Sequence, residues 1–260
     1  MADELEAYFD NDDERVAYEA FCAEQERGSD GFTLDAPALV CRWRMANKHV
    51  PLLNRHIRAL SQRRVNGEPL SHNMLSWAKQ HVEWSLAEGS YADRNGVLML
   101  VIDVNGNAAM TVGAYEPLPD VALGALIARA AQARAEAGET GVAPELLCAV
   151  TADGRLVLAA AADERACGAA TLVEQLAATR GHAVARVLPA SSGMEDAEAV
   201  MADAEDQFAA FRAAAGPGAA FFLVSDEHGV VPAAGNAADA DPDAAAFAEF
   251  LAAGYRKLFS

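Results

Sequence analysis

The segment 36–67 carries a positive charge that the rest of the chain does not share. It contains seven basic residues and no acidic one, whereas the whole chain has a formal net charge of −18. Arginine offers a planar fork that binds paired oxygen atoms, and a helix starting at Pro51 would add partial positive charge at its N-terminus. The segment therefore predicts a site for a small anion; the alternative is a solvated face that pairs with the acidic N-terminal helix. The basic residues are Arg42, Arg44, Lys48, Arg55, Arg58, Arg63 and Arg64.

Lysine is scarce, and this limits one class of chemistry. The sequence has three lysines, Lys48, Lys79 and Lys257. Schiff-base catalysis needs one of these amines, yet none falls on an expected strand of the second half. Lys79 lies in the middle of an expected helix, and Lys257 lies in the last turn of another, where a cation complements the helix dipole.

No set of histidines or cysteines has the spacing of a metal site. His72 and His81 lie nine residues apart on one expected helix and so point to opposite sides. The four cysteines are isolated in apolar segments, as is typical of inert thiols that stay reduced in a cytoplasm. The GxSxG and GxxxxGKS motifs are absent as well. We therefore expect no metal and no catalytic residue of these kinds.

The overall charge narrows the classes of partner. Acidic residues outnumber basic ones by 38 to 20, and such an excess repels nucleic-acid backbones and anionic lipid. No apolar run approaches the roughly 18 residues of a membrane span, and the acidic N-terminus is unlike a signal peptide. We expect a cytoplasmic protein with no nucleic-acid and no membrane partner.

The composition changes near residue 118. Residues 1–118 contain 15 of the 60 alanines, and residues 119–260 contain the other 45. Pro117 and Pro119 lie at this change, where they can continue neither a helix nor a central strand. We expect an N-terminal α/β domain over 1–118 and an alanine-rich C-terminal domain over 119–260.

Periodicity and end signals predict the elements of the N-terminal domain. Residues 37–46 alternate between two faces, which predicts a strand, and Asn105-Gly106 predicts the turn of a hairpin. Pro51 suits the first turn of one helix and Ser71 the cap of another. The expected elements are a helix over 2–27, the strand 37–46, a helix from Pro51 to about Val65, a helix from Ser71 to Gly89, and strands over 97–104 and 107–114.

The C-terminal domain alternates helices and strands in the same way. Asp153-Gly154 predicts a second hairpin, and either Asp241 or Asp243 can cap the last helix. The expected elements are a helix over 120–137 that ends at Gly138, strands over 146–151 and 155–160, a helix over 169–180, a strand over 183–188, a helix over 194–214, strands over 220–224 and 230–231, and the terminal helix. Because both domains mix hairpins with helices, we expect an α+β fold.

Taken in order, these segments resemble the class IV (fold-type IV) aminotransferases and aminodeoxychorismate lyases, which depend on pyridoxal phosphate. Residues 42–60 are similar to the strand, turn and LxxHxxRL helix of that family, and residues 168–187 to its cofactor-phosphate helix and next strand. Residues 221–232 resemble its late strand pair ending in VxP. The resemblance implies two domains with a D-amino acid aminotransferase-like fold. It also implies an anion or phosphate site, whose candidates are Arg58, Gly168, Thr171 and Ser225.

The chemical positions of that family are largely missing. Residues 118–180, where the family carries its Schiff-base lysine, contain no lysine. The phosphate arginine corresponds to Ala59, with Arg58 one position early, and the glutamate that pairs with the pyridine nitrogen corresponds to Leu158. Thr171 stands one position late for the GxT motif. The resemblance therefore implies a divergent member that has lost the usual lysine and takes no cofactor.

We thus expect a pseudoenzyme that binds a small anionic ligand or a protein partner, as a homodimer or as a heterodimer with a related subunit. One alternative is an active class IV enzyme that binds pyridoxal phosphate through Lys48 or Lys79. The other is an unrelated acidic α+β interaction protein.

Overall fold

The computed structural model describes residues 34–89, 93–188, 208–235 and 239–259, together with Val16 and Ala20. The helix expected over 2–27 therefore lies almost wholly outside the described residues. Of the helix expected over 194–214, residues 208–214 are described, and they belong to a helical stretch that continues to 215.

A three-stranded antiparallel sheet forms the core of the first half, residues 34–118. One face of the sheet is apolar because β1 alternates, and this face packs on the helices α3 (Leu53–Leu60) and α4 (His72–Glu88). The expected hairpin is confirmed, and Asp103 accepts hydrogen bonds of 2.9 Å from the backbone amides of Asn105 and Asn107 in its turn. The sheet order is β1 (Pro37–Arg44), β4 (Val97–Asp103), β5 (Ala108–Gly113).

The helix that starts after Pro51 is shorter than expected. It ends at Leu60, and a small hairpin of β2 (Arg64–Val65) and β3 (Glu68–Pro69) follows. Asn66 and Gly67 form its turn with φ angles of 53° and 81°, and such a pair favours a tight hairpin over a continued helix. Ser71 caps α4 as expected, since its hydroxyl accepts a hydrogen bond of 3.1 Å from the amide of Met74.

A five-stranded sheet forms the core of the second half, residues 119–259. All neighbouring strands are antiparallel except β7 and β8. The helices α6 (Gly168–Thr179) and α8 (Pro242–Arg256) cover one face, whereas α5 (Leu123–Thr140) and the helical residues 208–215 cover the other. The sheet order is β10 (Gly229–Pro232), β9 (Ala220–Ser225), β6 (Glu145–Val150), β7 (Leu156–Leu158), β8 (Val184–Arg186).

The C-terminus of α5 and the N-terminus of α8 can be compared with the residues that the sequence predicted for them. We expected α5 to stop at Gly138, but it continues through this residue to Thr140 and ends at Gly141. Gly141 has a φ of 87°, and a Cβ atom there would lie 2.8 Å from the carbonyl oxygen of Gln62, so the stop is fixed where the first half approaches. Of the two candidate caps of α8, Asp241 is the one used.

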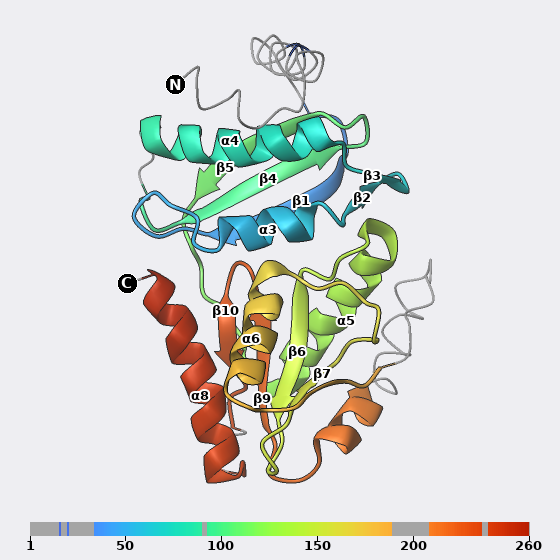
Figure 1. Ribbon diagram of the computed structural model, residues 1–260, viewed down its shortest axis with the longest axis vertical. Coiled ribbons are helices and arrows are strands. Elements are labelled where there is room, and N and C mark those ends of the chain that lie inside the picture. Colours follow the sequence, from blue (N-terminus) through green and yellow to red (C-terminus); the bar gives the residue numbers. More distant parts are fainter. Residues whose placement is uncertain are drawn as a thin grey trace.

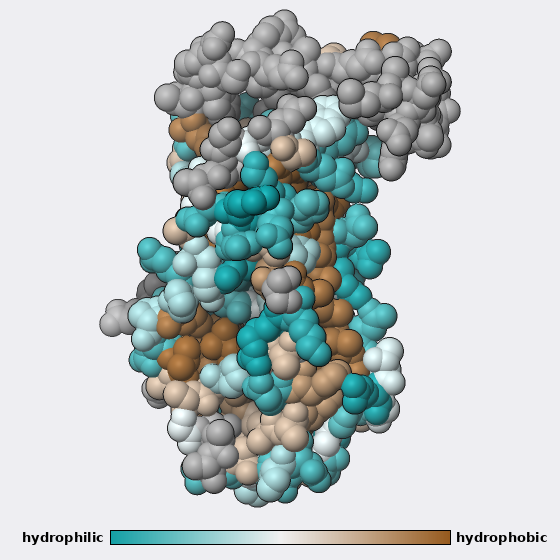
Figure 2. All heavy atoms as spheres, turned by 90° about the vertical axis from the view of Figure 1, so that its left-hand side faces the viewer, coloured by the Kyte–Doolittle hydropathy of each residue, from teal (hydrophilic) through white to brown (hydrophobic). Residues whose placement is uncertain are grey.

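The two halves stack end to end, with α3 facing α6 (Figure 1). The described strands of one half do not join the sheet of the other, and the segment 114–121, partly exposed and partly half-buried, connects the halves. Viewed from the side on which α8 lies, the surface mixes hydrophilic and hydrophobic residues (Figure 2). None of the helices in the described ranges is both long and apolar enough to cross a membrane. The two sheets are mostly antiparallel and are packed against helices, so the expected α+β fold is confirmed.

Candidate functional site

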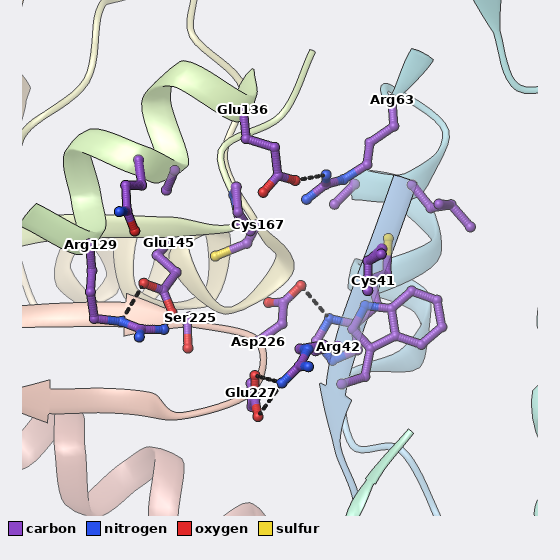
Figure 3. Close-up of a pocket in the computed structure, with 18 residues that line it drawn as sticks. Cys41, Arg42, Arg63, Arg129, Glu136, Glu145, Cys167, Ser225, Asp226 and Glu227 are labelled. Atoms are coloured by element: carbon purple, nitrogen blue, oxygen red, sulfur yellow. Dashed lines mark hydrogen bonds and ion pairs between the residues drawn. The ribbon is translucent and has the colours of Figure 1, made fainter. Parts of the chain in front are cut away.

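A cavity of about 310 Å³ lies between the two halves (Figure 3). The first half contributes β1 and α3 to its wall, and the second half contributes α5, β6 and the turn between β9 and β10. The basic segment 36–67 supplies β1 and α3, and two of its arginines, Arg42 and Arg63, line the cavity. We call this cavity the cleft.

Three arginines at the cleft are each paired with a glutamate. Two of the pairs join the first half to the second, and they show where the positive charge of segment 36–67 is balanced. A ligand with a carboxylate or an amino group could exchange partners with such pairs, because both partners line the cavity. The pairs are Arg42 Nη1 to Glu227 Oε1 at 3.4 Å, Arg63 Nη1 to Glu136 Oε1 at 2.9 Å, and Arg129 Nε to Glu145 Oε2 at 2.9 Å.

Asp226 joins the cleft to the N-terminus of α6. Its Oδ1 accepts a hydrogen bond of 2.7 Å from the amide of Ala169, and its Oδ2 accepts one of 3.3 Å from the amide of Gly168. These amides are the first donors of α6, where the helix dipole favours a negative charge. Oδ2 also lies 3.1 Å from Nδ1 of His56.

The surroundings of Asp226 keep it ionised. Burial acts to raise the pKa of this carboxyl, but the charge of His56 and the hydrogen bonds from His56 and α6 outweigh it, so the pKa lies below its usual value. Asp226 is therefore a buried carboxylate held by donors from two elements.

Packing holds the His56 side chain beside the Asp226 carboxylate. Its ring is 1% exposed and stacks on Trp43, with the ring centroids 5.5 Å apart. Nε2 lies 2.9 Å from the carbonyl oxygen of Pro51. Both ring nitrogens thus lie close to an oxygen atom, Nδ1 to Asp226 Oδ2 and Nε2 to the carbonyl oxygen of Pro51.

The backbone of Asp226 is clamped as well. Its carbonyl oxygen accepts hydrogen bonds from the amide of Arg44 at 3.1 Å and from the hydroxyl of Tyr255 at 3.3 Å. Gly229, at the start of β10, has a φ of 74°, and a Cβ atom there would lie 2.2 Å from the Tyr255 ring. The close approach of this ring therefore needs glycine at 229. The turn contacts β1, α3, α6 and α8 at once.

The residues that the sequence nominated for an anion site are only partly brought together. The Gly168 amide contacts Asp226, and Ser225 lines the cleft with its Oγ accepting a hydrogen bond of 2.8 Å from the amide of His228. Thr171 Oγ1 donates to the Gly168 carbonyl at 2.7 Å and accepts from Arg55 Nη1 at 2.9 Å.

Arg58 is not at this position. It is exposed and does not line the cleft, because two residues along a helix turn the side chain by about 200° from the buried His56. Arg55 is the arginine of α3 that reaches α6.

Sequence reasoning missed Asp226, Arg129 and the glutamates of the cleft. Of the segment Ser225-Asp226-Glu227-His228 only Ser225 was predicted to belong to a site, although polar residues at the end of a buried strand are a common signal of function. The pairing of Asp226 with an amide 58 residues away has no local signal.

Two thiols at the cleft are unreactive. Cys41 and Cys167 line the cavity and are buried. Burial raises the pKa of Cys41 to about 11 and that of Cys167 well above its usual value, so both stay protonated at neutral pH. Across the described part of the chain, no group of three or more histidines, cysteines and carboxylates could hold a metal ion.

Comparison with known proteins gives similarity in structure only. No protein-family model and no curated protein matches the chain. Among solved structures, it is similar to a hypothetical aminotransferase from Mycobacterium tuberculosis in its apo form, with 15% identity over 84% of this chain and 89% of that one, at a TM-score of 0.51. The PLP-bound form of a hypothetical aminotransferase from the same organism matches with 15% identity over 86% of this chain and 94% of that one, at a TM-score of 0.52.

The second of these structures corrects one expectation. We expected the protein to take no cofactor, and this is contradicted because a neighbour with the same fold is in a PLP-bound form. The expected α+β, aminotransferase-like fold agrees with both neighbours. The chain therefore has the fold of an aminotransferase.

Proposed function

We propose that this protein binds a small polar molecule in the cleft and does not catalyse transamination. It would be a divergent relative of the class IV aminotransferases. Pyridoxal phosphate, held without a covalent bond, is the first candidate ligand because a neighbour of the same fold holds PLP. The observation that carries the proposal is a cleft of about 310 Å³ with charged walls and no lysine among its lining residues.

The lysines do not fit a Schiff-base role. All three lie within the described ranges, and none lines the cleft. The Nζ atom of Lys48 donates a hydrogen bond of 2.7 Å to the carbonyl oxygen of Gly89, at the end of α4. Since covalent attachment of pyridoxal phosphate needs an amine beside the ligand, we derive no catalytic step through it.

The charged walls favour a ligand that carries polar groups of its own. Three arginines stand within the cavity wall, each already beside a glutamate. A carboxylate or hydroxyl of the ligand can share an arginine with its glutamate, whereas an apolar ligand would bury these charges without replacing their hydration. We therefore expect polar molecules to bind more tightly than apolar ones of equal size.

Ligand binding can be followed through Trp43, which is buried and lines the cleft. We expect added pyridoxal phosphate to quench its fluorescence in a saturable way, and a W43F variant to lose that part of the signal. Borohydride reduction followed by mass spectrometry should then give no lysine adduct. An adduct on any lysine would instead support an active enzyme, and no saturable binding of this or other polar ligands would refute the proposal.

That the chain assembles as a homodimer, or as a heterodimer with a related subunit, stays a prediction. Light scattering of the purified chain, alone and with a related subunit, measures it directly.

A further inference from the structure

We propose that Asp226 is a built-in anion that sets the cleft's preference among anionic ligands. Its carboxylate occupies the donors that a phosphate or carboxylate group of a ligand would otherwise use. A phosphate group entering this end of the cleft must therefore displace Asp226. The inference deepens the proposed function and depends on it for the location of the ligand.

The donors around Asp226 form a complete anion cradle. Two consecutive backbone amides, of Gly168 and Ala169, point at the carboxylate, and His56 supplies a third contact at 3.1 Å. Helix N-termini with free amides are common sites for phosphate and carboxylate groups. In this chain such a group is already present, and it comes from the turn between β9 and β10.

Two features connect the cradle with the cleft. Asp226 and His56 both line the cavity, so removal of the Asp226 side chain would open the cradle to it. Without Asp226, Nδ1 of His56 would lie buried, in a ring that is 1% exposed, with no oxygen atom beside it. A buried unpaired donor of this kind favours an anion that enters from solution.

The cradle is also narrow where α6 meets α3. A Cβ atom on Gly168 would lie 2.8 Å from His56 Nδ1 and 3.1 Å from the backbone nitrogen of His56. The helices α3 and α6 are therefore in direct contact beside the cradle. The ligand and Asp226 compete because both would use the same two backbone amides.

The test uses inorganic phosphate as the probe and three variants of the full chain. D226A removes the carboxylate and opens the cradle. D226N keeps the shape but not the charge, so its amide still fills the space. D241A is the matched control, because Asp241 caps α8 with hydrogen bonds to the amides of Asp243 and Ala244 and lies outside the cleft.

We expect phosphate to raise the melting temperature of D226A at concentrations that leave wild type, D226N and D241A unchanged in a chloride buffer of equal ionic strength. The apparent Kd for phosphate should be lower in D226A than in wild type by about tenfold or more, the effect of one charge-assisted contact. Adding H56Q to D226A should remove most of the gain.

If D226A is unfolded in chloride buffer, the same titration is followed as recovery of helix by circular dichroism, and D226S serves as a milder variant. Equal phosphate responses in D226A, D226S and wild type would overturn the proposal. Since phosphate is tested alone, this result is independent of whether pyridoxal phosphate binds to the cleft.

Discussion

Two helices of the second half have an aspartate bound to their N-terminal amides, but the two aspartates come from different places. Asp241 stands directly before α8 and accepts from the amide two residues later at 2.9 Å. Asp226 caps α6 from a turn that lies 57 residues beyond Ala169. The first aspartate stabilises its own helix, whereas the second also fixes α6 to α3 and β1. The same hydrogen-bond chemistry is therefore local at α8 and holds the two halves together at α6.

The largest difference in stability is expected between the alanine variants of these two aspartates. We expect D226A to lower the free energy of unfolding by about 3–5 kcal/mol, because it removes one partner of the buried Asp226–His56 contact and leaves two amides of α6 without an acceptor. D241A should cost about 1 kcal/mol, as is usual for a lost helix cap. Urea denaturation of both variants in phosphate-free buffer measures the difference, and equal losses would mean that Asp226 acts only as a cap.

The close contact of α6 with α3 predicts a smaller effect. G168A should lower the free energy of unfolding by about 1–3 kcal/mol, because the new methyl group meets His56. The matched control is G124A near the start of α5, where a Cβ atom would have nothing within 4 Å. This change should raise the stability by up to about 1 kcal/mol, since alanine is the better helix former. Stabilisation by both changes would show that α3 can move away from α6.

A pH effect should come from the turn of Asp226. Burial, followed by the charges of Arg129, Arg42 and Arg44, lowers the pKa of His228 to about 4. Glu227 Oε2 lies 3.7 Å from its Nε2, and the ring of Tyr115 packs beside it.

Between pH 6.5 and 4 the unfolded chain therefore binds a proton that the folded chain does not, and stability falls as the pH falls. H228Q should reduce that fall by about 1 kcal/mol after allowance for solvent screening. Thermal melts of wild type and H228Q at pH 7 and pH 4.5 measure the change, and parallel curves would contradict the assignment.

The smallest expected effect distinguishes two arginines of α3. R55A removes the hydrogen bond to Thr171 and should cost about 0.5–1 kcal/mol. R58A changes an exposed side chain and should stay within about 0.5 kcal/mol of wild type. If R58A were the more harmful change, the orientation of α3 over α6 would differ from the one described.

Signals that act within a few residues were predicted well. Ser71 and Asp241 cap the helices that follow them, and Asn105-Gly106 and Asp153-Gly154 each lie between paired strands. The caps accept hydrogen bonds from amides next to them in sequence, and Gly106 and Gly154 take the φ angles of 83° and 81° that the turns need, so the cause is local in each case.

One failed prediction had a local cause, because Asn66-Gly67 forms a hairpin turn where a longer α3 was expected. The others failed where the cause lies in a distant segment. The stop of α5 at Gly141 depends on the approach of Gln62, and the role of Gly168 depends on His56. The fold itself could be predicted from the order of many weak local signals. The cleft could not, because its charged pairs and Asp226 join residues far apart in sequence.

The tethering of Asp226 has a consequence for thermodynamic linkage. A protein that takes a helix-capping anion from solution is stabilised in proportion to the logarithm of the ligand concentration, so it loses stability when the ligand is scarce. Asp226 is part of the chain, and a tethered group has an effective concentration on the order of millimolar or more whatever the solution contains. At the N-terminus of α6, the folded state therefore does not depend on the supply of any metabolite.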